Sequence, residues 1–361
     1  MGLSKKLKLI QQRGTLFYNL LRAQRLKLLR PVVCDLFITT RCNGQCNYCY
    51  TDKTISRDEE LSTEQWKAII DELFSLGCRM FNLMGGEPLL RYDFANILEH
   101  ILKKDVICDV NTNCFLVPKY LDVLKQTSQI FTSVDGDEHA HDLNRGKGSY
   151  EKTLRGIIAA RKAGIPVRIN CTITRHNTEK IDFLIDLCEK HNLFLTFTPL
   201  VRVRDVLHKR ATSLYLNDRE AKETFLRIKK AKKATNRILN SDASLDFFIN
   251  YPVALDKIVR RDETGKHADY YDKLCPYGRF QFFVISNGDV FPCHNMWNEP
   301  SFLPKNILSD GMCGALLNAG KLWCKYCWLA NLVEWNQSTS LNWLIKGALM
   351  TLKQVAVCEK L

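Results

Sequence analysis

Residues 41–50 read RCNGQCNYCY, and the three cysteines of this run decide how the rest of the chain is interpreted. Cys42, Cys46 and Cys49 follow the spacing C-x3-C-x2-C. An iron–sulfur cluster normally takes four cysteine ligands, so three thiolates at this spacing can hold three irons of a [4Fe–4S] cluster and leave the fourth iron open. A small molecule can then complete the coordination shell. The run therefore predicts a redox enzyme.

The composition indicates a globular cytoplasmic protein. The chain has 361 residues and 46% of them are apolar, which suits one large domain with a smaller one, or two domains. No apolar run is long enough to span a bilayer, and basic residues interrupt the leucines of the N-terminus, unlike a signal peptide. The 15 cysteines cluster at metal-ligand spacings, which favours reduced thiols over disulfides.

The net charge of +13 is unevenly distributed. Residues 1–30 carry eight Lys/Arg and no acid, and residues 202–237 carry twelve Lys/Arg against four acids. Such runs form either a solvated face or a surface that attracts lipid head groups, a phosphorylated substrate or nucleic acid. Leucines recur at helical spacing over residues 15–30, and Pro31 is expected to end this helix. The basic amphipathic segment 1–30 either lies on a membrane surface or docks against the rest of the protein.

After Pro31, strand-like and helical segments alternate. We expect strands at residues 32–39, 80–84, 107–110, 130–134, 167–173 and 194–197, with helices between them. This order predicts a parallel α/β sheet with right-handed crossovers. Polar residues and glycines follow the carboxyl ends of the strands, which form the catalytic rim in α/β barrels. Cys42–Cys49, Gly85–Glu87, Asn113 and Ser133–Gly136 are therefore expected to converge.

A second cysteine set lies further along the chain. Cys275 and Cys293 flank a predicted β-hairpin with an Asn-Gly turn, and Cys324 and Cys327 follow at C-x2-C spacing. Four thiolates can hold zinc or an iron–sulfur cluster, and ligand type alone does not separate the two. The first motif favours a second cluster. A cluster closed by four cysteines can relay an electron but cannot bind substrate through iron.

These motifs resemble the radical S-adenosylmethionine (SAM) superfamily, in the branch with a SPASM or Twitch C-terminal extension. The resemblance covers residues 32–330 and includes the triad, the GGEP segment at residues 85–88 and the run SVDG at residues 133–136, followed by Arg145-Gly146. It implies an α/β fold, a partial (β/α)6 TIM-like barrel with a small C-terminal domain of a β-hairpin plus a helix. The implied parts are the N-terminal helix 1–30, the barrel 31–235, a helical linker 236–274, an auxiliary-cluster domain 275–330 and a helical tail 331–361.

The resemblance also implies roles for single residues. The amino and carboxylate groups of SAM chelate the open iron of the cluster held by the triad. The backbone of Gly85, Gly86 and Glu87 meets the SAM amino group, and Tyr48 lies near the adenine. The candidates for the ribose and the carboxylate of SAM are Asn113, Ser133 and Arg145. An external one-electron donor such as flavodoxin or ferredoxin is implied as a partner.

The chain departs from the full SPASM pattern after Cys327, because Val333 stands where the next cysteine is due. We therefore expect a Twitch-type half-domain with one auxiliary [4Fe–4S] cluster. Cys358 is either a remote further ligand or a free thiol. Cys313, between the two ligand pairs, is a candidate hydrogen-atom donor or an ordinary buried or free thiol. Asp289 is a candidate base, as is Glu334, although acidic residues in loops are usually only solvated.

We expect a radical SAM oxidoreductase or epimerase that cleaves SAM to a 5′-deoxyadenosyl radical and abstracts a substrate hydrogen atom, assisted by the auxiliary cluster. The expected substrate is a sugar or cyclitol, an anionic or lipid-linked metabolite, or a peptide. One alternative is a non-catalytic binding protein stapled by zinc or a cluster. Another is an RNA-modifying radical SAM enzyme. Because the basic runs lack interleaved aromatic residues, a nucleic-acid partner is not expected.

Overall fold

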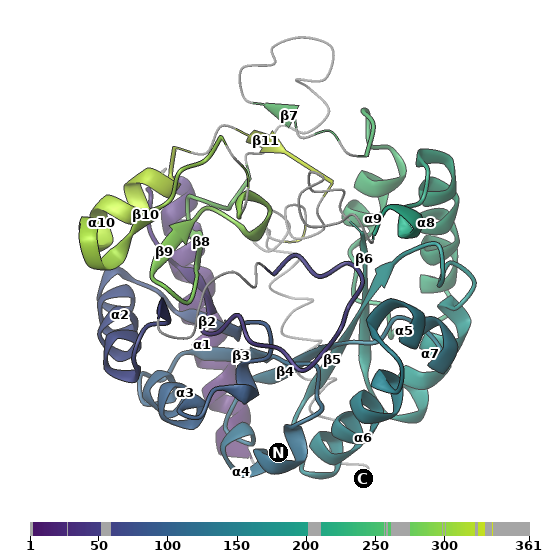
Figure 1. Cartoon of the computed structure of the whole chain (residues 1–361), viewed down its shortest axis with the longest axis horizontal. Helices are drawn as coiled ribbons and strands as arrows, with labels where there is room; N and C mark the ends of the chain where they lie inside the picture. Colours follow the sequence, from purple (N-terminus) through teal and green to yellow (C-terminus); the bar gives the residue numbers. More distant parts are fainter. Residues whose placement is uncertain are drawn as a thin grey trace.

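The computed structural model describes residues 3–26, 28–51, 59–200, 211–255, 257, 259–260, 275–297, 299, 301–321, 324–328 and 334. Within these residues, a curved nine-stranded sheet has the order β10-β9-β8-β1-β2-β3-β4-β5-β6 (Figure 1). Six neighbouring strands run parallel: β1 (Val33–Phe37), β2 (Met80–Met84), β3 (Ile107–Asn111), β4 (Gln129–Ser133), β5 (Val167–Ile173) and β6 (Phe194–Pro199). The predicted partial α/β barrel is confirmed.

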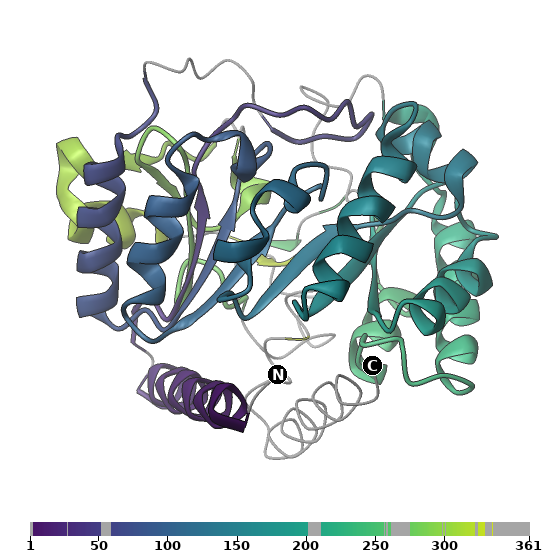
Figure 2. The ribbon, with the colours of Figure 1, turned by 90° about the horizontal axis from the view of Figure 1, so that it is seen from below.

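Helices cover the outer face of this sheet (Figures 1 and 2). They are α2 (Thr63–Leu76), α3 (Phe94–Leu102), α4 (Leu121–Leu124), α5 (Glu138–Arg145), α6 (Ser149–Lys162) and α7 (Ile181–Lys190). Helix α2 shows why such segments form. Ser62 and Gln65 make a reciprocal capping box at its start, Gly77 ends it in the left-handed conformation, and Trp66 and Leu73 are buried on one face.

Alternation along the strands separates two environments. In β5, every second residue from Val167 is buried, and the residues between, such as Arg168 and Asn170, are only half-buried. Successive side chains of a strand point to opposite faces, so one set packs under the helices and the other faces the barrel interior. The interior therefore contains polar side chains as well as apolar ones.

The C-terminal hairpin continues the barrel sheet. Strands β8 (Gln281–Val284) and β9 (Asp289–Phe291) pair antiparallel, and β8 also pairs parallel with β1. Strand β10 (Lys305–Asn306) and helix α10 (Ile307–Ala319) follow, so the predicted hairpin plus helix is present. Strand β11 (Cys324–Tyr326) pairs with β7 (Val259–Arg260) in a separate two-stranded sheet.

Helices α8 (Asp218–Lys232) and α9 (Asp242–Ile249) lie beyond β6. Lys229 and Lys232 of α8 form ion pairs with acids of α9, so part of the basic run holds two helices together. The expected helical linker 236–274 contains α9 and strand β7, and residues 261–274 lie outside the described residues. Of the expected helical tail 331–361, the structure describes Glu334 alone.

Helix α1 (Leu3–Arg25) begins earlier than expected and ends six residues before Pro31. Its inner face is buried through Leu16, Leu20 and Ala23, which pack on residues at the amino ends of the strands. Figure 2 shows α1 beneath the sheet. The helix therefore docks against the barrel floor, as in one of the two alternatives predicted for residues 1–30, docking on the protein or contact with a membrane surface. Within the described residues, no helix has the length and apolar character needed to cross a membrane.

Candidate functional site

The cysteine triad lies on the loop that follows β1, at the end of the barrel opposite α1 (Figure 2). Hydrogen bonds hold this loop to two elements that are distant in sequence. The Asn113 side-chain amide, just beyond β3, donates to Asn43 Oδ1 at 2.7 Å. The backbone N–H of Asn47 donates to the Asn144 carbonyl oxygen of α5 at 2.9 Å. The loop is thus fixed against the carboxyl rim of the sheet, as predicted from the strand order.

Gly85 and Gly86 allow the end of β2 to lie directly against the end of β1. The Gly86 N–H donates to the Thr39 carbonyl at 2.7 Å, and the Glu87 N–H donates to the Arg41 carbonyl at 2.7 Å. A Cβ atom on Gly86 would lie 2.4 Å from the Arg41 carbonyl oxygen, and one on Gly85 would lie 2.6 Å from that of Thr39. Both contacts exclude any larger residue without backbone movement.

Glu87 connects this segment to β3. Its fully buried carboxylate accepts hydrogen bonds from the Thr112 hydroxyl at 2.8 Å, the Asn113 N–H at 2.8 Å and the Leu89 N–H at 3.0 Å. Burial raises the pKa of Glu87 to about 7, against these three donors. Glu87 therefore positions Asn113, which in turn holds the triad loop.

A buried charge network joins the triad to β4 and α5. The Tyr48 hydroxyl donates to Asp135, and Arg145 Nε donates to Asp135 Oδ2 at 2.7 Å. Arg145 Nη1 lies 3.9 Å from Cys46 Sγ, and its guanidinium carbon lies 5.2 Å from the centre of the Tyr48 ring. Burial raises the pKa of Cys46, and the Arg145 charge opposes this rise. Arg145 therefore favours the thiolate form of Cys46.

The donor set of the triad fits an iron–sulfur cluster. Three thiols share one loop, and the Gly44 N–H donates to Cys42 Sγ at 3.2 Å, so two of the three sulfurs have a hydrogen-bond donor. Such donors stabilise thiolate ligands and tune the cluster. Each of these thiolates would bind a different iron of the cluster. In the part of the chain that the structure describes, no three Cys, His, Asp or Glu side chains are grouped around one point to hold a single metal ion.

Cys293, a member of the second cysteine set, lies near the triad loop. Burial raises the pKa of Cys327 to about 12, and the nearby Cys293 adds to this rise. Cys275 and Cys324 are also buried, and Cys358 lies outside the described residues. The rings of Tyr50 and His294, which directly follow Cys49 and Cys293, lie 5.3 Å apart between their centres. The two cysteine sets are therefore joined by an aromatic contact.

Other predicted residues lie elsewhere. Ser133 ends β4 at the rim and is half-buried. Cys313 is exposed on α10, which packs on β9 and β10 at the outer flank (Figure 1). Asp289 accepts a hydrogen bond from the Asn306 amide at 2.8 Å, and Glu334 accepts one from the Ser241 N–H at the start of α9, at 2.7 Å. The roles of Cys313, Asp289 and Glu334 in chemistry remain predictions.

The sequence interpretation gave no role to two residues that build the site, although both lie in segments expected to converge. Asp135 belongs to the SVDG run and is fully buried between Tyr48 and Arg145. An acid directly after a buried strand was the available signal. Asn43 lies inside the triad loop, and nothing in its sequence context distinguishes it from a solvated polar residue.

Comparisons with known proteins agree with this geometry. Residues 36–188 match the family model described as the radical SAM superfamily. Fe-coproporphyrin III synthase of Methanosarcina barkeri is 34% identical over 43% of this chain, and the match spans 40% of its own length. Mycofactocin maturase MftC of Mycolicibacterium smegmatis is 28% identical over 78% of this chain and 68% of its own. Streptococcus suis SuiB bound to precursor peptide SuiA superposes with a TM-score of 0.65 at 17% identity, over 83% of this chain and 66% of that one.

Proposed function

Because this chain belongs to the radical SAM superfamily, we propose that it cleaves SAM reductively and abstracts a hydrogen atom from a substrate. The observation that carries the proposal is the convergence of the triad loop, Gly85–Glu87 and Asn113 at the carboxyl rim. The cofactors of the chain are a [4Fe–4S] cluster and SAM. When bound, the reduced cluster would supply one electron to SAM, which splits into methionine and a 5′-deoxyadenosyl radical.

The protein residues hold and orient these groups. Cys42, Cys46 and Cys49 are the ligands, and Arg145 supports the thiolate of Cys46 through its N–H. Gly85 and Gly86 lie against the backbone of residues 39–41, and their own backbone would meet the SAM amino group.

We further propose that Cys275, Cys293, Cys324 and Cys327 hold one auxiliary [4Fe–4S] cluster that takes an electron from the substrate radical. The influence of Cys293 on Cys327 supports their closeness, and the Tyr50–His294 contact joins this region to the triad loop. An external one-electron donor completes the cycle. Loss of this electron together with a proton gives a dehydrogenated product, whereas epimerisation requires a hydrogen atom to be returned to the substrate radical instead.

A peptide is the proposed substrate class. One relative that aligns along most of this chain is a mycofactocin maturase, and a relative that matches 46% of this chain is the sporulation killing factor maturation protein SkfB of Bacillus subtilis. A protein of the same fold, SuiB, is seen bound to a precursor peptide. Sugars, cyclitols and lipid-linked metabolites remain the competing classes.

The outer face of α1 supports a separate proposal of peripheral membrane contact. Leu7, Ile10 and Tyr18 are 60%, 45% and 62% exposed, and Arg22 and Arg25 lie on the same helix. Apolar and basic side chains together suit the surface of an anionic bilayer. Flotation with anionic liposomes should separate the wild type from a Leu7→Ser/Tyr18→Ser variant, and equal partition would reject the contact.

The catalytic proposal is tested by anaerobic reconstitution, reduction with dithionite and measurement of 5′-deoxyadenosine. We expect SAM-dependent product in the wild type and none in Cys46→Ala. The Cys327→Ala variant should retain 5′-deoxyadenosine formation but bind about four irons instead of about eight. A fully loaded wild type that forms no 5′-deoxyadenosine would refute the catalytic proposal, and an unchanged iron content in Cys327→Ala would refute the auxiliary cluster.

A further inference from the structure

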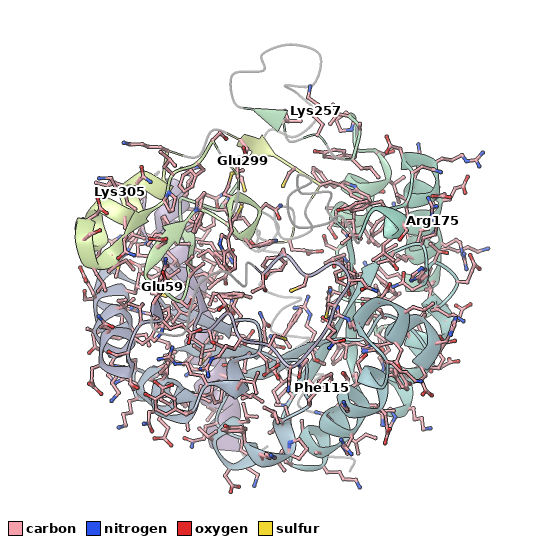
Figure 3. The ribbon with its side chains drawn as sticks, viewed as in Figure 1. Glu59, Phe115, Arg175, Lys257, Glu299 and Lys305 are labelled. Carbon is pink, nitrogen blue, oxygen red and sulfur yellow. The ribbon has the colours of Figure 1, made fainter. Side chains whose placement is uncertain are left out.

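The inward-facing side chains of the sheet form layers along the barrel axis. Residues paired in the parallel register lie at similar heights, so the register defines these layers. The floor layer is apolar and packs on α1; its members are Val33, Met80 and Ile107. The layer above it is polar and consists of Asp35, Asn82, Asp109 and Gln129 in register. Side chains from several strands point into the space that the sheet encloses (Figure 3).

A polar layer is unusual, because branched apolar side chains dominate the interior layers of α/β barrels. One of its two carboxylates has its charge compensated. Asp109 Oδ2 accepts from the Gln129 amide at 2.6 Å, and Oδ1 has no hydrogen-bond partner among the described residues, but the positive charges of Arg13 from α1 and Arg168 from β5 act on this carboxylate. Asp109 is therefore explained as part of the contact between the barrel and its floor.

The other carboxylate, Asp35, is not compensated in this way. It is 6% exposed and accepts hydrogen bonds from the Asn82 amide at 2.5 Å and the Gln281 amide at 2.9 Å. Among the residues that the structure describes, these two neutral amides are the groups that stabilise its charge. A buried carboxylate without a cation is costly, and buried charges are normally paired.

An acceptor without a donor lies next to Asp35. Gln281 uses its amide nitrogen to donate to Asp35, and its own Oε1 is buried without a hydrogen-bond partner within the described chain. Gln281 itself is 3% exposed. Neighbouring strands β1 and β8 therefore carry a carboxylate that lacks a counter-charge and an amide oxygen that lacks a donor among the described residues.

Asp35 also lies on the strand that connects the two regions of cysteines. Strand β1 leads into the triad loop, and its neighbour β8 belongs to the hairpin that precedes Cys293. Neighbouring Asn82 is only half-buried, so the interior at this height is reachable. A group bound at Asp35 would thus lie inside the barrel and below the rim where the radical forms.

We propose that Asp35 binds a cationic group of the substrate, an ammonium or a guanidinium, and that Gln281 Oε1 accepts its second hydrogen bond. Such a group supplies both missing features, a positive charge for the carboxylate and N–H donors for two acceptors. A sugar hydroxyl supplies donors but no charge. The inference rests on the proposed function, because it names the side-chain class of the peptide that the barrel receives: lysine or arginine.

The test uses the anaerobically loaded full chain with SAM and three probes: N-acetyl-L-lysine amide, N-acetyl-L-arginine amide and the uncharged N-acetyl-L-norleucine amide. Calorimetric titration should show at least one cationic probe binding about tenfold or more tighter than the norleucine probe, as for a charge-assisted contact. Asp35→Asn keeps the shape and should abolish this preference. Asp122→Asn, which removes a fully exposed acid on α4, should keep it.

Equal binding of charged and uncharged probes, no binding of any probe, or an unchanged preference in Asp35→Asn would each overturn the proposal. If Asp35→Asn fails to fold, Gln281→Leu replaces it and should weaken the cationic probe about two- to tenfold, as expected for one hydrogen bond. An unchanged affinity there would also overturn it. Formation of 5′-deoxyadenosine is measured separately, so failure of the cation site leaves the catalytic proposal standing.

Discussion

Gly86 lies against the backbone that leads into the triad loop. We therefore predict that Gly86→Ala, which adds a methyl group outside this loop, disrupts the triad more than Gly44→Ala, which adds one inside it. In Gly86→Ala, the new Cβ would lie 2.4 Å from the Arg41 carbonyl and 2.6 Å from that of Thr40. Both neighbours are backbone atoms, so the two segments must separate. Overpacking of this kind costs about 1–3 kcal/mol.

The separation also weakens two hydrogen bonds, from Gly86 N–H to Thr39 and from Glu87 N–H to Arg41. Each contributes about 0.5–1.5 kcal/mol, so the total cost is about 2–6 kcal/mol. Gly44→Ala is the matched control within the triad loop. Its Cβ would lie 3.4 Å from Cys42 Sγ, an ordinary contact, and Gly44 does not occupy the left-handed region. Its cost should stay below about 1 kcal/mol.

Urea unfolding of the apoproteins gives the free energies, and iron analysis with electron paramagnetic resonance of the reconstituted proteins gives triad loading. We expect Gly86→Ala to lose stability and triad signal while Gly44→Ala keeps both. If the two variants load iron equally and unfold within about 0.5 kcal/mol of each other, the inferred dependence of the triad loop on β2 is wrong.

Three further predictions concern Glu87, Asp135 and Leu20. Folding raises the pKa of Glu87 from 4.5 to about 7, so the contribution of its protonated form to stability is complete below about pH 4.5 and is lost as the pH rises through 7. The unfolding free energy of the wild type should therefore fall relative to that of Glu87→Gln by up to about 3 kcal/mol between pH 5 and 8. Parallel pH curves of the two proteins in urea titrations would contradict this. Asp135→Asn leaves buried Arg145 without its carboxylate and should cost about 3 kcal/mol by urea unfolding, whereas a loss below about 1 kcal/mol would show that the pair is not stabilising. Leu20→Ala should lower the free energy of unfolding by about 2–5 kcal/mol, because Leu20 is 1% exposed between α1 and the barrel floor. The loosened helix should also be cleaved faster by trypsin after Arg13, and unchanged cleavage would mean that other contacts hold α1.

Local patterns were sufficient to predict the strands of the barrel. The expected strand at 80–84 coincides with β2, and that at 167–173 with β5, because both combine apolar runs with defined turns at each end. The N-terminal helix was placed less well, over 15–30 instead of Leu3–Arg25. Its end is set by tertiary pairing: Arg30 and Val32 donate backbone hydrogen bonds to Arg279 and Phe280, which draws this segment into an extended form.

Contacts between distant segments could not be predicted from periodicity. Strand β8 joins β1 although about 250 residues separate them, and no local signal specifies that register. The same holds for the pairing of Arg145 with Asp135 and its approach to Cys46. The sequence motifs predicted which residues carry the chemistry, whereas the groups that position them depend on how the strands align.

The position of α1 bears on which substrate classes suit this barrel. Helix α1 covers the floor, and the triad loop lies at the opposite end of the strands (Figure 2). If the exposed face of α1 rests on a bilayer, the radical site faces away from it, so an acyl chain anchored in the same membrane would have to span the full height of the barrel. Membrane contact through α1 therefore disfavours a lipid-linked substrate. A water-soluble peptide that enters from the rim and carries a cationic side chain to Asp35 meets no such constraint, and that geometry favours it over the other substrate classes.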